Sequence, residues 1–163
     1  MFMNQETLKS VITDVLAVMP VKPFLCLQMS ALLYANLTDS HGVKCSLVTG
    51  DLSFKGTVIF KQDRSISGIN NELLNLWSGH AWVNLDGLII DLSFFRTIYS
   101  DIFTKPCKPE LISFFGTNRG IIIAPPEGML EINLLYTPKE TLSDEVATAI
   151  IKGIPPLLQQ IGG

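Results

Sequence analysis

This sequence is poor in basic residues and has no long hydrophobic run. It contains 12 Lys and Arg against 15 Asp and Glu in 163 residues, a formal net charge of −3 at pH 7. Its nearest approach to a basic cluster, Lys105–Lys108, is too short to follow a phosphate backbone, so nucleic acid is not expected as the main partner. No apolar stretch approaches the roughly 18–20 residues that cross a bilayer, so a membrane is not expected as a partner either.

Cysteine is also scarce. The three cysteines, Cys26, Cys45 and Cys107, are odd in number and scattered, without a C-x-x-C pair. A disulfide framework is therefore not expected, which favours a reducing compartment. The first residues lack the basic start and continuous apolar core of a signal peptide. We expect a cytoplasmic protein, although a secreted effector without a cleavable signal would share these features.

Apolar residues, by contrast, are abundant. They make up 47% of the chain, and the mean hydropathy is +0.35. Such a composition excludes a disordered chain, because enough surface can be buried to offset the entropy cost of ordering. The length suits one sizeable hydrophobic core, so we expect residues 1–163 to form a single domain. The sequence does not indicate the oligomeric state.

Helical periodicity is clear near the N-terminus. Apolar residues recur every three to four positions over residues 5–18, which predicts an amphipathic helix that Pro20 ends. A short connector with Pro23 follows. Residues 26–37 are apolar on almost every side, which is typical of a buried central helix, and Gly42 is suited to end it.

Beyond residue 42 the pattern predicts mainly strands. They are expected at 43–47, 56–60, 80–85, 88–93, 121–124 and 130–136. The polar segment 61–79 is expected to be a loop with a helical turn at 72–76, and segment 94–119 has no clear pattern. Thr141 and Asp144 resemble a capping box that opens a final helix, which Pro155 and Pro156 interrupt. The fold class predicted is α+β, with an antiparallel sheet packed on the helix that starts at Cys26.

The strongest hairpin signal lies at Asp86-Gly87, between two runs of strand-forming residues. Side chains alternate along strands, so one face of this hairpin is wholly apolar while the other carries His80, Trp82 and Asp91. His80 and Asp91 are diagonal neighbours across the two strands, about 7–8 Å apart at the backbone. We therefore expect a carboxylate–imidazole hydrogen bond, which would hold the ring in one tautomer and stabilise its protonated form.

Cys26 is the candidate nucleophile. It opens the buried helix, where free N–H groups and the helix dipole favour a thiolate. The same N–H groups would help to bind a developing oxyanion. Taken alone, Cys26 would more often be a buried core thiol, but together with His80 and Asp91 it predicts acyl-transfer chemistry.

Three segments carry a family resemblance. Residues 26–37 read CLQMSALLYANL, residues 41–50 read HGVKCSLVTG, and residues 79–91 read GHAWVNLDGLIID. Together they resemble the transglutaminase-like core pattern, in which a cysteine opens an Ala/Leu-rich helix and a His-Ala-Trp-Val strand is followed by an aspartate. The resemblance covers residues 26–93, somewhat under half of the chain.

This resemblance implies a papain-like fold and a Cys-His-Asp triad. Cys26 would be the nucleophile, His80 the general base and acid, and Asp91 the residue that orients the imidazole. The implied function is a peptidase, amidase, deamidase or transglutaminase that works through a thioester, with a peptide, protein or small amide as substrate. Neither a cofactor nor a metal is implied. Trp82 would shield the His–Asp hydrogen bond or form a wall that contacts the substrate.

Alternatives remain open at this point. Pro23-Phe-Leu25 precedes the cysteine, and no Gln or Asn lies close before it as a side-chain oxyanion donor, which motivates an inert binding module on the same fold. An arylamine N-acetyltransferase-like enzyme shares the residue order, but the Arg-Gly-Gly run before the cysteine is absent. A zinc site is not expected, because the cysteines and histidines lack ligand spacing.

Overall fold

A computed structural model describes residues 3–66 and 77–156 of the chain. The helical turn expected at 72–76 lies outside the described residues, as do residues 67–71 of the loop expected around it. Within the described ranges no helix is long and apolar enough to span a membrane.

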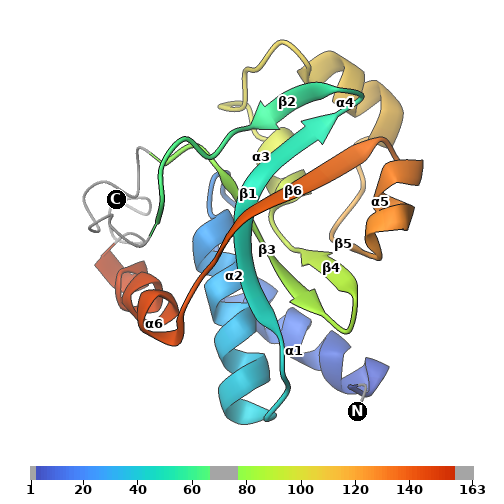
Figure 1. Cartoon of the computed structure of the whole chain (residues 1–163). Helices are drawn as coiled ribbons and strands as arrows, with labels where there is room; N and C mark the ends of the chain where they lie inside the picture. The colour runs from blue at the N-terminus through green and yellow to red at the C-terminus, as the bar shows by residue number, and fades with distance from the viewer. Residues whose placement is uncertain (1–2, 67–76, 157–163) are drawn as a thin grey trace.

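Helices and strands are mixed along the chain (Figure 1). The helices are α1 (Gln5–Val18), α2 (Cys26–Ala35), the π-helical η1 (Asn36–Ser40), α3 (Phe94–Ile98), α4 (Lys108–Phe115), α5 (Pro126–Glu131) and α6 (Asp144–Lys152). The strands are β1 (Ser46–Phe54), β2 (Thr57–Phe60), β3 (His80–Leu85), β4 (Leu88–Asp91), β5 (Ile122–Ala124) and β6 (Leu134–Thr141). The predicted α+β class is confirmed.

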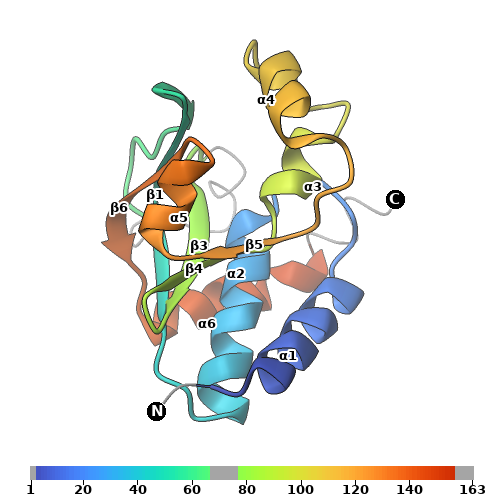
Figure 2. The ribbon, with the colours of Figure 1, turned by 90° about the vertical axis from the view of Figure 1, so that its right-hand side faces the viewer.

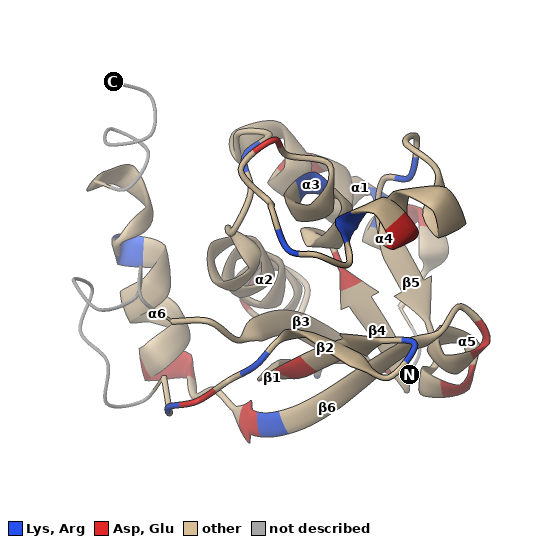
Figure 3. Ribbon diagram, turned by 90° about the horizontal axis from the view of Figure 1, so that it is seen from above, with Lys and Arg blue, Asp and Glu red and all other residues tan. Residues whose placement is uncertain are grey.

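All strand pairs of the six-stranded sheet are antiparallel. The order is β2-β1-β3-β4-β5, and β6 also pairs with β1. Strands β2 and β3 pair with successive parts of β1, and β6 pairs with its opposite edge. Helix α2 packs against β1 and β3, with α1 and α6 on either side of it (Figures 1 and 2). Figure 3 shows that charged residues lie mostly at the periphery and that α2 carries none. The predicted packing of the sheet on α2 is confirmed.

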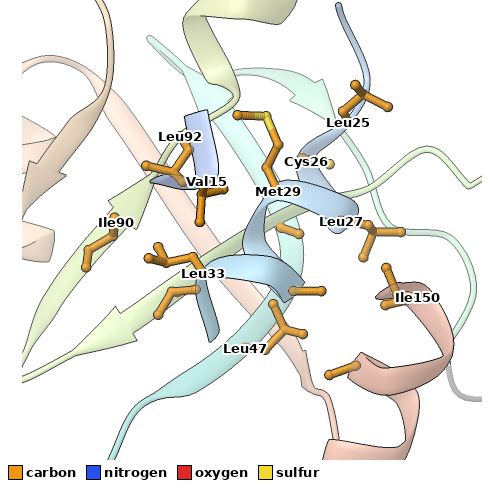
Figure 4. Packing of buried hydrophobic residues seen from close by; sticks show 14 of the residues in the cluster. Val15, Leu25, Cys26, Leu27, Met29, Leu33, Leu47, Ile90, Leu92 and Ile150 are labelled. Atoms are coloured by element: carbon orange, nitrogen blue, oxygen red, sulfur yellow. The ribbon is translucent and has the colours of Figure 1, made fainter. Parts of the chain in front are cut away.

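Alternation along the strands produces two hydrophobic clusters, one on each face of the sheet. The first lies under α2 and includes Met29, Leu33, Leu47 and Ile90, all with 0% exposure (Figure 4). The second is rich in aromatic residues and packs β3 and β4 against α3 and α4. Because the predicted apolar face of the hairpin belongs to the first cluster, its other face, with His80 and Asp91, turns towards the aromatic cluster.

Several boundaries agree with the sequence. Helix α1 spans the predicted residues, and Asn4 caps it through a hydrogen bond from the Glu6 N–H. Helix α2 begins at Cys26 as expected, although its last turn widens into η1 before Gly42 takes a φ of +62°. The strands predicted at 56–60 and 121–124 are present as β2 and β5.

Some predicted strand boundaries and the predicted final helix cap were wrong in detail. The strand expected at 43–47 runs instead over Ser46–Phe54, because pairing with three other strands outweighs the local alternation. The strand expected at 130–136 begins at Leu134, since α5 extends to Glu131. The final helix is capped by Ser143, whose hydroxyl accepts the Val146 N–H, rather than by Thr141.

Gly50 is required where β1 passes closest to β6. A Cβ atom at this position would lie 1.9 Å from the carbonyl oxygen of Thr137, a main-chain atom that cannot turn away. Gly50→Ala is therefore expected to force β1 and β6 apart and to lower the free energy of unfolding by about 3 kcal/mol or more. Urea denaturation measures the effect.

A matched control is Gly120→Ala. An added Cβ at Gly120 meets no atom within 4 Å, and its backbone does not occupy the left-handed region. We expect its unfolding free energy to stay within about 0.5 kcal/mol of the wild type. Equal stabilities of the two variants would contradict the close β1–β6 approach.

Candidate active site

The hairpin of β3 and β4 sets the geometry of the site. Its register pairs Leu85 with Leu88, Asn84 with Ile89 and Val83 with Ile90, as the two-residue turn predicts. Both turn residues have positive φ, +51° for Asp86 and +78° for Gly87, which matches the right-handed twist of the strands. Strand β4 ends at Asp91 rather than at Ser93, and its ladder with β3 extends no further than the pair Val83–Ile90.

His80 and Asp91 make the hydrogen bond that the hairpin predicts. His80 Nε2 lies 2.6 Å from Asp91 Oδ2. Both side chains are buried, with 2% exposure for His80 and 0% for Asp91. A buried pair in this geometry fixes the ring, and it leaves Nδ1 as the nitrogen open to a further partner.

Asp91 accepts further hydrogen bonds. The Tyr136 hydroxyl donates to Oδ2 at 2.7 Å, the same oxygen that binds His80. The other oxygen, Oδ1, accepts the backbone N–H groups of Ser93 and Phe94, each at 3.1 Å, where α3 begins. Both oxygens of this buried carboxylate are thus held by donors, which is what keeps an acid ionised away from water.

Cys26 lies at the start of α2 and reaches the His80 ring. Figure 4 shows its side chain at the first turn, beside Leu25 and Leu27. The Cys26 thiol lies near enough to the imidazole to be among the groups that raise the pKa of His80. Cys26 has 9% exposure, more than either partner. The structure therefore brings together the three residues predicted as catalytic.

The turn before Cys26 is held from outside α2. Phe24 has a φ of +62°, a left-handed conformation that is strained for an aromatic residue. Its backbone N–H donates to Thr97 Oγ1 of α3 at 3.1 Å, which supports this conformation. Within the described part of the chain no side chain caps the N-terminus of α2, so the N–H groups of its first turn lack both an intrahelical partner and a side-chain cap.

Charges at the site reinforce one another. Burial alone would lower the pKa of His80, but the charge of Asp91, the hydrogen bond to Asp91 and the nearby Cys26 outweigh it and raise the pKa from 6.5 to about 10. Burial would raise the pKa of Asp91, yet His80 and the donors from Tyr136 and Ser93 keep it below its usual value. His80 is therefore an imidazolium and Asp91 a carboxylate at neutral pH.

Aromatic rings enclose the imidazole. Phe60 stacks on His80 with ring centroids 5.0 Å apart and an interplanar angle of 14°. Trp82, Phe94 and Tyr136 lie at 6.3, 6.4 and 6.1 Å. Trp82 has 1% exposure and lies beside the His–Asp pair, as the shielding interpretation expects. Its contact with a substrate stays a prediction.

The remaining cysteines and histidine lie apart from the site. Cys45 is half-buried, and burial raises its pKa to about 11. Cys107 is half-buried at the start of α4. His41 is exposed at the end of η1. In residues 3–66 and 77–156, no three His, Cys, Asp or Glu side chains gather in a group that could hold a metal ion.

Sequence reasoning missed Tyr136 and Phe60. Both come from strands that neighbour β1, and neither stands in a motif with His80 or Asp91. A residue 45 positions from its partner leaves no local spacing signal. The one available hint was the buried carboxylate itself, which needs more donors than a single histidine supplies.

Tyr136→Phe is expected to weaken the site without dismantling the fold. It removes one of the donors on Asp91 Oδ2, so the unfolding free energy should fall by about 1.5–3 kcal/mol. The Asp91 carboxylate also loses stabilisation, so the pH dependence of Cys26 alkylation at the alkaline end should change. Denaturant titration and a pH profile of Cys26 alkylation measure the two effects. Tyr34→Phe, which removes a hydroxyl bonded to Asp144, is the control and should leave the pH profile unchanged.

Searches against protein-family models, curated proteins and solved structures found no match for this chain.

Proposed function

We propose that this protein is a cysteine-dependent acyl-transfer enzyme that acts on amides through a thioester. The observation that carries the proposal is the position of the His80 ring, which is bonded to Asp91 at Nε2 and also contacts Cys26. A thiol, an imidazole and a carboxylate in this order are the parts of an activated nucleophile. The reaction catalysed would be that of a peptidase, amidase, deamidase or transglutaminase.

In the proposed reaction, the Cys26 thiolate attacks the carbonyl carbon of the amide. The developing oxyanion is held by free N–H groups in the first turn of α2, where the helix dipole also favours negative charge. The tetrahedral intermediate collapses as the C–N bond breaks. The departing amine takes a proton from His80, and the acyl group stays on sulfur as a thioester.

In the second half of the proposed reaction, His80 acts as a base. It takes a proton from water or an amine, which attacks the thioester and releases the Cys26 thiolate. Asp91 does not exchange a proton, since Tyr136 and two backbone N–H groups stabilise its ionised form. Phe60 and Trp82 keep water from the His–Asp hydrogen bond.

A papain-like core is part of this proposal. It is supported by a buried helix that begins with the nucleophile and packs on an antiparallel sheet, with the histidine and the acid on two adjacent strands. The positions of His80 and Asp91 follow from the hairpin, and that of Cys26 from the connector that Thr97 pins.

A second candidate is an inert binding module on the same fold. The observation that favours it is burial, because His80 has 2% exposure and Cys26 only 9%. An arylamine N-acetyltransferase-like enzyme is a weaker alternative, and it predicts that coenzyme A raises the melting temperature. No shift with coenzyme A would remove that alternative.

The test is a screen of the full chain against amide and glutamine-containing peptides. Cys26→Ala is expected to lower kcat/KM by about 10³-fold or more. Cys107→Ala is the matched control, because Cys107 is half-buried and lies at α4, and its activity should equal that of the wild type. Turnover that survives in Cys26→Ala would overturn the proposal. The absence of any turnover, with Cys26 no more reactive than Cys107, would favour the binding module.

A further inference from the structure

A cavity lies at the C-terminal end of α1, and none of Cys26, His80 and Asp91 lines it. Here the connector after α1, the end of α3 and the segment before β5 line a cavity of about 600 Å³. Figure 2 shows the end of α1 and α3 on the same side of the molecule. Three basic residues, Lys22, Arg96 and Arg119, contribute to the lining, against one acid, Asp101. The cavity is therefore positively charged.

Arg96 forms a fixed wall of the cavity. Its Nη1 donates to the carbonyl oxygens of Met19 and Pro20 at 3.2 Å, and its Nη2 donates to that of Leu16 at 3.4 Å. These oxygens belong to the C-terminal end of α1 and the residues after it, where the helix dipole favours a cation. These three hydrogen bonds tie α3 to α1 and hold the positive charge of Arg96 in the wall of the cavity.

Arg119 and Lys22 are exposed cations with donors to spare. Arg119 is oriented by its Nε, which donates to Phe115 O at 3.4 Å, and by its backbone N–H, which donates to the Tyr99 hydroxyl at 3.2 Å. Among the residues that the structure describes, the terminal nitrogens of Arg119 and the ammonium of Lys22 have no hydrogen bond or ion pair. A guanidinium and an ammonium on one cavity suit a carboxylate or a phosphate.

The rest of the lining is largely apolar. Leu16, Val21, Pro23, Ile102 and Ile121 all face the cavity. Apolar walls with a few convergent polar groups are typical of small-molecule sites. The combination fits an organic molecule that carries an anionic group on an apolar body.

We propose that this cavity binds a small organic anion, a carboxylate or phosphate on an apolar body, through Arg119 and Lys22. The site does not depend on acyl-transfer chemistry. It does share the connector with Cys26, because Val21, Lys22 and Pro23 line the cavity and α2 begins a few residues later.

The test is a chemical-shift titration of the ¹⁵N-labelled full chain with benzoate, phenyl phosphate and neutral benzamide. We expect saturable shifts at the backbone amides of Val21, Lys22 and Gly120, with at least one anion binding about tenfold or more tightly than benzamide. Comparing benzoate with phenyl phosphate distinguishes a carboxylate site from a phosphate site.

Variants make the test specific. Arg119→Gln and Lys22→Gln, both at exposed positions, should each weaken binding of the preferred anion, by about tenfold for Arg119→Gln. Lys152→Gln on α6 is the control for lost positive charge and should bind as the wild type does. Equal affinity for benzamide and the anions, unchanged binding in Arg119→Gln, or no saturation up to about 20 mM would overturn the proposal.

Discussion

Iodoacetamide is expected to alkylate Cys26 at pH 7 at least about tenfold faster than Cys107, and His80→Gln should abolish that difference. The physical reason is the imidazolium beside the sulfur. Because the pKa of His80 is raised to about 10 by Asp91 and Cys26 against the cost of burial, the ring stays protonated at neutral pH and stabilises a thiolate. The thiolate, not the thiol, is the form that reacts.

Mass spectrometry of proteolytic peptides after timed quenching measures each cysteine in the same sample. Cys45 provides an internal reference, since burial raises its pKa to about 11 and it should label most slowly. Between pH 6 and pH 8 the rate at Cys26 should rise less steeply than the rate at Cys107, because the positive charge of His80 is present throughout this range. Parallel rates at Cys26 and Cys107 across this range would argue against an ion pair with His80.

Asp91→Asn is expected to cost roughly 3–5 kcal/mol in the free energy of unfolding, because it breaks a buried ion pair by removing one partner. The substitution leaves His80 buried with a weakened hydrogen bond, and it removes the charge that Tyr136 and two backbone N–H groups hold. Urea titration followed by tryptophan fluorescence at pH 6.5 measures the loss. Asp86→Asn, at the exposed hairpin turn, should remain within about 0.5 kcal/mol of the wild type.

The free energy of unfolding is also expected to change with pH in a defined direction. His80 has a raised pKa in the folded state, so its contribution to stability is complete below 6.5 and is lost as the pH rises towards about 10. Asp91 has a lowered pKa, so its contribution is present above 3.8 and is lost as the pH falls below that value. Wild-type stability should therefore decline from pH 6.5 to 10. Asp91→Asn should show little of this decline, and an identical decline in both proteins would contradict the pairing.

The predictable parts of the site are those whose positions follow from local sequence patterns. The two-residue turn at Asp86-Gly87 sets which residues face each other, so the approach of His80 to Asp91 follows from counting along two strands. The buried helix of residues 26–35 and the break at Pro23 likewise place Cys26 at a helix start. In both cases one local rule determines the position of a functional side chain.

The parts that were not predictable depend on distant contacts. Tyr136 reaches Asp91 only because β6 pairs with β1. Phe60 covers His80 because β2 and β3 both pair with β1, Phe60 at Leu52 and His80 at Gly50. Segment 94–119 showed no pattern, yet it contains α3 and α4. Helix α3 has only five residues, Phe94–Ile98, and is held at its start by Asp91 rather than by its own sequence.

Helix α3 also connects features that are far apart along the chain. Its first N–H group binds the Asp91 carboxylate, Thr97 binds the Phe24 N–H, and Arg96 binds the carbonyl groups at the end of α1. One short helix therefore sets the spacing between Asp91 and the loop that precedes Cys26. A substitution that tilts α3 would displace both Asp91 and the loop before Cys26. Loss of activity can therefore originate at a residue that touches no reacting atom.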